Sequence, residues 1–165
     1  MRRINLVAFL GVLAAMPAAA YDVNGVALGA PEAKIRQQFP SAHCKALEWE
    51  SMAAERRCDD ARVQFGGIEV RVTFYLKKDA VEAFDIRFDG RDAERFAGFL
   101  KKRYGAPRSE VRDTLERKGK AAREAYKVLW EAKGERAVLS SQQGERRASL
   151  SVARGNFDEE IYRVR

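Results

Sequence analysis

The feature that most constrains the fold is a run of strict alternation from Ile68 to Lys77. Every second side chain in this run is large and apolar, and the members of that series are Ile68, Val70, Val72, Phe74 and Leu76. A period of two over this length indicates a β-strand with one buried face. A second alternating run at 84–88 follows a polar break, which predicts a hairpin. We therefore expect this hairpin to form the centre of the hydrophobic core.

Residues 1–20 have the pattern of a secretory signal peptide. Arg2 and Arg3 precede an apolar run at 6–16, and three alanines at 18–20 supply the small residues before a cleavage point. The apolar run is short for a retained membrane-spanning helix, so an uncleaved anchor is the weaker alternative. We expect cleavage after Ala20.

The mature chain, residues 21–165, is expected to form a single α+β domain in the periplasm or outside the cell. Its first cysteine is Cys44, so no lipid anchor on an N-terminal cysteine is expected. Loss of Arg2 and Arg3 leaves 29 of the 31 basic residues against 24 acidic ones, a net charge of +5. Both signs are mixed along the chain, which is typical of an ordinary solvated surface.

The charge pattern also limits the partners. No stripe of Arg and Lys with interleaved aromatic residues is present, so nucleic acid is not an expected partner. For a basic envelope protein, the expected partner is another envelope protein, and an anionic lipid or lipopolysaccharide is the second candidate.

Cys44 and Cys58 are predicted to form a disulfide, because an even pair of cysteines in an exported chain usually does. A redox or metal pair is the alternative. The spacing is not Cys-x-x-Cys, and His43 is the only histidine, so neither a metal nor a cofactor is expected.

The remaining elements alternate between helix and strand patterns. Helices are expected at 31–39 and 93–104, where apolar residues recur three or four positions apart. Strands are expected at 44–49, 56–65, 110–116, 126–131, 137–141 and 148–152, with an exposed connection after 116 and a last short strand around Ile161, Tyr162 and Val164. The prediction is an antiparallel sheet of about eight strands in two α-β4 blocks, about 21–88 and 89–165, with both helices on one face and one disulfide.

This pattern resembles small exported bacterial proteins built from tandem helix-plus-sheet modules. The residues that carry the resemblance are Leu28-Gly29-Ala30-Pro31 before the first helix, the cysteine pair across the next strands, and Phe96, Leu100 and Tyr104-Gly105-Ala106-Pro107 at the second helix. The beta-lactamase inhibitor protein group and the small outer-membrane assembly lipoproteins have this architecture. Such families bind other proteins, so the resemblance implies a binding role.

No motif in the chain points to catalysis. A hydrolase using His43 is the remaining enzymatic alternative, but the sequence has no Gly-x-Ser-x-Gly or Ser-x-x-Lys motif. We therefore expect a non-catalytic module for protein binding or envelope maintenance. The candidate binding face is the polar side of the central hairpin, which carries Arg71, Thr73, Tyr75, Lys77 and Arg87.

Overall fold

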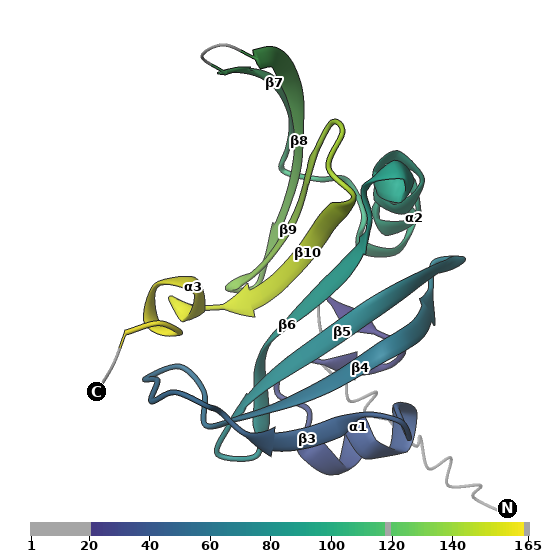
Figure 1. Cartoon of the computed structure of the whole chain (residues 1–165). Coiled ribbons are helices and arrows are strands. Elements are labelled where there is room, and N and C mark those ends of the chain that lie inside the picture. The colour runs from purple at the N-terminus through teal and green to yellow at the C-terminus, as the bar shows by residue number, and fades with distance from the viewer. Residues whose placement is uncertain (1–20, 118–119, 164–165) are drawn as a thin grey trace, which may run out of the picture.

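The computed structural model describes residues 21–117 and 120–163, which form an α+β fold around one eight-stranded antiparallel sheet (Figure 1). This confirms the fold class expected from the sequence. The strands of the large sheet are β3 (His43–Ala46), β4 (Arg56–Phe65), β5 (Ile68–Lys77), β6 (Ala80–Asp89), β7 (Ser109–Arg117), β8 (Lys120–Ala132), β9 (Glu135–Gln142) and β10 (Arg147–Arg154). Their order across the sheet is β3-β4-β5-β6-β10-β9-β8-β7.

The hairpin of β5 and β6 lies near the middle of the large sheet and supplies fully buried core residues, as expected. Phe74 pairs with Phe84 across the two strands, and both side chains are fully buried. Two glycines at positive φ, Gly66 at 63° and Gly67 at 77°, make the turn that leads from β4 into β5. A two-residue turn of this kind matches the twist of the flanking strands, so the register between β4 and β5 is set locally.

The two blocks join through their last strands. β6 ends the first block and β10 ends the second, and these strands pair antiparallel with Ile86 opposite Leu150. Each block is a four-stranded meander, so the sheet order reads forward through one block and backward through the other. The two meanders are thereby related by an approximate twofold axis between β6 and β10.

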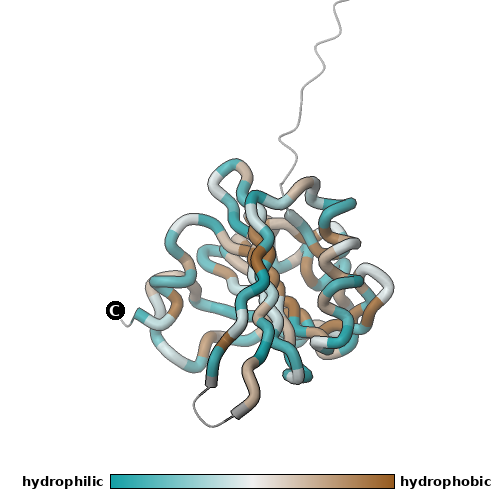
Figure 2. Tube along the Cα trace, turned by 90° about the horizontal axis from the view of Figure 1, so that it is seen from above, coloured by the Kyte–Doolittle hydropathy of each residue, from teal (hydrophilic) through white to brown (hydrophobic). Residues whose placement is uncertain are grey.

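Two helices cover one face of the sheet, α1 (Glu32–Gln38) and α2 (Ala93–Tyr104). The ring of Phe39, at the end of α1, lies 5.1 Å from that of Phe74, and Phe96 of α2 lies 4.7 Å from Phe88. A small hairpin, β1 (Asp22–Val23) and β2 (Val26–Ala27), packs beside α2. Figure 2 shows the C-terminus on the side of the sheet opposite these helical coils. None of the helices among the described residues is long and apolar enough to cross a membrane.

Two expectations about the second half are wrong. The exposed connection after β7 is much shorter than expected, because β8 already begins at Lys120 and pairs with β7 along most of its length. The tail forms a short helix, α3 (Phe157–Glu160), and not a last strand, because its apolar residues Phe157 and Ile161 lie four apart and pack together against the sheet. Val164 and the predicted signal peptide, 1–20, lie outside the described residues.

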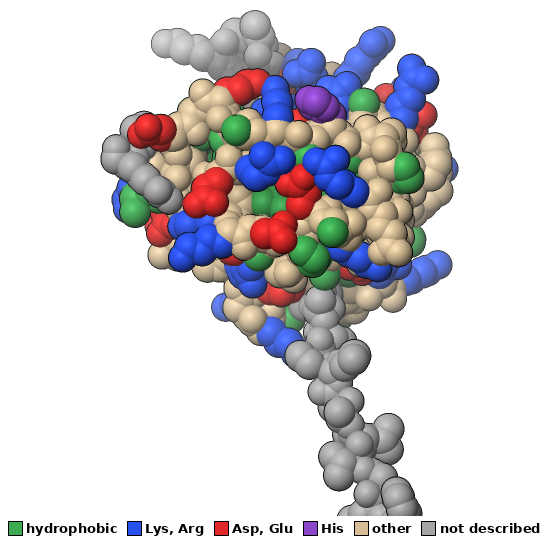
Figure 3. Space-filling view, turned by 90° about the horizontal axis from the view of Figure 1, so that it is seen from below, with side chains coloured by type: hydrophobic (Ala, Val, Ile, Leu, Met, Phe, Trp, Pro, Cys, Tyr) green, Lys and Arg blue, Asp and Glu red, His purple; other side chains and the backbone are tan. Residues whose placement is uncertain are grey.

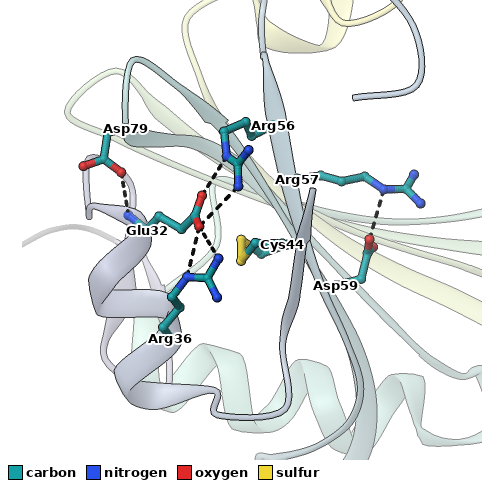
Figure 4. The surroundings of a disulfide bond; sticks show 8 residues. Glu32, Arg36, Cys44, Arg56, Arg57, Asp59 and Asp79 are labelled. Atoms are coloured by element: carbon teal, nitrogen blue, oxygen red, sulfur yellow. Dashed lines mark hydrogen bonds and ion pairs between the residues drawn. A yellow bond between two sulfur atoms is a disulfide. The ribbon is translucent and has the colours of Figure 1, made fainter. Parts of the chain in front are cut away.

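The predicted disulfide is present and links the edge strand β3 to β4. Cys44 and Cys58 lie opposite each other in register, with 4.0 Å between their Cα atoms, and Cys58 is fully buried. Glu32 at the start of α1 lies beside the bond, where its carboxylate accepts hydrogen bonds from Arg36 and Arg56 (Figure 4). These contacts hold α1 against β4, next to the short edge strand β3.

We predict that reduction of Cys44–Cys58 lowers the free energy of unfolding by about 3 kcal/mol, because the bond closes a loop with a sequence separation of 14 and restricts the unfolded chain. Urea unfolding of the oxidised and reduced protein measures this change. The double variant Cys44→Ala/Cys58→Ala is the control, since reductant should leave its midpoint unchanged. Equal midpoints for the oxidised and reduced wild type would contradict the prediction.

We also predict that Glu32→Gln destabilises the fold at neutral pH by up to about 1 kcal/mol. The hydrogen bond from Arg56, followed by that from Arg36, lowers the pKa of Glu32. The contribution of ionised Glu32 to the free energy of unfolding is therefore complete above the ordinary glutamate pKa of about 4.3. It is lost as the pH falls through the lower pKa that Glu32 has in the folded protein. Urea unfolding between about pH 7 and 2 measures the free energy of unfolding, which should fall less steeply in acid for Glu32→Gln than for the wild type. Glu69→Gln is the control, because Glu69 is exposed and has no ion pair among the described residues. Its profile should follow that of the wild type. Parallel profiles for Glu32→Gln and the wild type would refute this assignment.

Candidate binding surface

The five residues expected to bind lie on the face of the sheet opposite α1 and α2, which we call the outer face. Arg71 is opposite Arg87 in register, and Thr73 and Tyr75 follow at alternate positions of the same strand. Lys77 comes at the end of β5, after a shift in register. The structure thus places all five on one side of the central hairpin, but it divides them between a covered half and an open half.

Tyr75 is not available on the surface, contrary to the sequence-based expectation. Its side chain is only 9% exposed, and its ring lies 5.5 Å from that of Phe157 in α3. Ala83 and Ala153 line the same apolar patch, where small side chains on neighbouring strands leave room for Phe157. Burial, followed by the charge of Asp85, raises the pKa of Tyr75 to about 12.

We call the structure that covers Tyr75 the C-terminal clasp: α3 with residues 161–163, and the segment 47–54. Its two halves are joined by side-chain contacts, and other contacts fasten it to the sheet. These contacts are a hydrogen bond from the Trp49 indole to the Ile161 carbonyl (3.0 Å), one from the Ser51 hydroxyl to the Glu160 carbonyl (3.3 Å), an ion pair of Asp158 with Arg136 (2.5 Å), and a hydrogen bond from the Lys77 ammonium to the Met52 carbonyl. The Lys77 ammonium is therefore already hydrogen-bonded within the protein.

The open half of the outer face carries four cationic side chains, which we call the basic cluster: Arg71, Arg87, Lys127 and Arg147. All four are exposed and project from strands β5, β6, β8 and β10. Two serines lie between Arg87 and Lys127 across the strands, because Arg87 is opposite Ser149, Ser149 is opposite Ser140, and Ser140 is opposite Lys127. Lys127, Arg147 and the serines were missing from the sequence-based set, since their proximity to Arg87 depends on the pairing of β6 with β10.

The basic cluster has few electrostatic partners. The side chains of Arg71, Lys127 and Arg147 form no hydrogen bond or ion pair with any described residue. Asp89, which faces Arg147 in register, is instead bound by Arg91 at 2.8 Å. Many other arginines of the described chain are ion-paired; Arg103 with Asp22 and Arg154 with Glu82 are examples.

Arg87 has two charged neighbours on its own strand, Asp89, which is bound by Arg91, and Asp85. The Asp85 carboxylate is largely enclosed, so burial raises its pKa, while a hydrogen bond from Ser151 and the charge of Arg87 act in the opposite direction. No ion pair within 4.0 Å forms between Asp85 and Arg87. Thr73, on the other side of Asp85, donates a hydrogen bond to Asp59 at 2.8 Å. Because Asp85 forms no ion pair with Arg87, the exposed guanidinium of Arg87 is open to a ligand.

A hollow of about 420 Å³ lies over β8, β9 and β10 at one end of the basic cluster. Lys127, Arg147, Ser140 and Ser149 are among its lining residues, and Glu145 contributes to its wall. The Glu145 carboxylate is ion-paired with Arg123. Two cations and two hydroxyl groups thus face one concave surface, which is a suitable arrangement for an anionic group.

The single histidine does not join a catalytic arrangement with the described residues. His43 is exposed on β3, and its imidazole forms no hydrogen bond with any of them. Asp59 lies opposite His43 in register, but its carboxylate accepts a hydrogen bond from Thr73. The same carboxylate forms an ion pair with Arg57, with 3.0 Å between them, although Arg57 Nε is not aligned for a hydrogen bond (Figure 4). Figure 3 shows basic and acidic side chains interspersed over the end of the molecule below α1 and β3.

The ligand atoms of Glu32, Cys44 and Cys58 lie within 4.8 Å of one another. The two sulfur atoms are bonded to each other, so they offer no thiolate to a metal ion. The carboxylate of Glu32 is bound by Arg36 and Arg56. This group therefore acts in the attachment of α1.

We predict that Phe157→Ala lowers the pKa of Tyr75 from about 12 towards its ordinary value of about 10, because water then reaches the phenol. The chemical shift of a ¹³C-labelled Tyr75 ring carbon, assigned with Tyr75→Phe, reports the titration. Phe157→Leu is the matched control, since it keeps an apolar cover. An unchanged pKa in a folded Phe157→Ala variant would show that α3 does not shield Tyr75.

Searches against protein-family models, curated proteins and solved structures find no match for this chain. The resemblance to exported tandem-module proteins therefore stays a prediction based on the pattern of elements.

Proposed function

We propose that this chain is a non-catalytic, exported module that binds another envelope protein through the open half of its outer face. The observation that carries the proposal is the basic cluster, in which four exposed cations share one open face and have no ion pair among the described residues. Arginine is enriched at protein interfaces, where its flat guanidinium binds carboxylates in a bidentate manner.

The energetics of the sheet support a functional role for the basic cluster. Arg71 and Arg87 are direct cross-strand neighbours, and like charges at such positions destabilise a sheet by about 0.2–1 kcal/mol. A chain selected only for stability would gain by replacing one of them. We infer that the pair is kept for binding, where an acidic partner would remove the repulsion.

The proposed location outside the cytoplasm is supported by two features. The chain begins with a signal-like segment, and the cysteines form a disulfide, which persists mainly in oxidising compartments. An envelope protein is therefore the partner that the mature chain is expected to meet. The second candidate, an anionic lipid or lipopolysaccharide, is supported by the same cations and is separated in the experiment below.

We predict that Arg87→Gln abolishes capture of the partner while leaving the fold as stable as, or slightly more stable than, the wild type. The oxidised mature protein serves as bait for envelope extract, and captured proteins are compared by mass spectrometry. Lys102→Gln, which removes the same charge from an exposed site on α2, is the matched control and should retain the partner.

The proposal fails if Arg87→Gln and Lys102→Gln capture the same proteins as the wild type. Binding of the wild type to vesicles that contain lipopolysaccharide, lost in Arg87→Gln without any captured protein, would instead favour the lipid candidate.

A further inference from the structure

The basic cluster divides into two parts on the outer face. The first is the Arg71–Arg87 pair, whose side chains stand directly opposite each other on β5 and β6. The second is the hollow over β8–β10, where Lys127 and Arg147 stand beside Ser140 and Ser149. Each part places two cations on an exposed surface, so each can bind one carboxylate by donating charge-assisted hydrogen bonds to it.

From this arrangement we infer that the open half of the outer face recognises an extended acidic segment of a protein, with two acidic side chains four residues apart. This inference rests on the proposed function and specifies the chemistry of the partner. One acidic side chain binds Arg87, with Arg71 beside it, and the other enters the hollow beside Lys127.

The spacing of the strands gives the separation of the two carboxylates. Arg87 and Lys127 lie three strand steps apart, across β10 and β9, which corresponds to about 14 Å at the usual strand spacing. In an extended segment, side chains on the same side repeat every second residue, so positions i and i+4 are separated by about 13 Å. A segment that crosses the strands at a right angle therefore meets both parts with acidic residues at i and i+4.

Other features of the outer face favour discrete carboxylates over a lipid surface. Asp85 and Asp89 are interspersed with the basic residues, and Glu145 forms part of the wall of the hollow. A broad anionic surface would bring its charges close to these carboxylates, whereas a narrow segment can place its acidic groups at the cations alone. Lys127, Arg147, Ser140 and Ser149 in the lining of the hollow offer a carboxylate charge-assisted hydrogen bonds.

Short synthetic peptides test this inference by NMR titration of the ¹⁵N-labelled mature protein. Three peptides made of threonine, serine and glycine carry two glutamates four residues apart, two glutamates two residues apart, or two glutamines. We expect the first to bind about two- to fivefold more tightly than the second, with the third weakest, because only the first engages both parts. The amides of Arg71, Arg87, Lys127 and Ser149 should shift, and Lys127→Gln should remove the difference between the glutamate peptides. Lys102→Gln should preserve it.

Equal affinity for the three peptides, or shifts confined to residues elsewhere, would overturn the inference. Two further probes are tested alongside the peptides, inorganic phosphate and vesicles of phosphatidylglycerol. Stronger shifts of the same amides with either probe would also overturn the inference, in favour of a phosphate ligand. If Arg87→Gln loses the captured envelope protein although no peptide binds, the proposed function stands and the acidic-segment chemistry falls. If peptide recognition holds but capture is insensitive to Arg87→Gln, the proposed function falls.

Discussion

Burial of one side of the β5–β6 hairpin is the interaction on which the rest of the structure depends. Phe74 and Phe84 form its fully buried centre, and large side chains of this kind contribute roughly 1.5–3 kcal/mol each on burial. The seven residues of α1 could not form a stable helix alone and need this surface. The second block adds β10 to the exposed edge of β6, with Leu150 beside Ile86, so both halves share one core.

The same alternation that builds the core also produces the outer face. Residues between the buried positions point away from the helices, and their character changes along the strands. On the β6 side of Tyr75 the residues on successive strands are the alanines Ala83 and Ala153, which allow Phe157 and Ile161 to pack and form the clasp. Near Arg71 the neighbours are charged or hydroxylic, so no apolar cover forms there. The division between closed and open halves thus follows from side-chain size and charge.

Much of the architecture could be predicted because its signals are local. The bounds of β4, β5 and α2 agree with the sequence analysis, since each is defined by an unbroken period or by glycine at its end. The clasp could not be predicted in this way. Phe157 lies in a polar tail, and its contact with Tyr75 links segments 82 positions apart. Tyr75 was therefore expected at an interface, although the structure buries it.

The sequence by itself determined the types of the main helices and strands, the cysteine pair and the side of each strand on which a residue lies, because dihedral preferences and periodicity act over a few residues. Only the tertiary structure decided which strands from distant parts of the chain are neighbours. Pairing of β6 with β10 brings Arg87 and Lys127 onto one surface, although 40 positions separate them in the chain. Such proximity arises from burial and backbone hydrogen bonding between distant segments, and a local pattern carries no record of it.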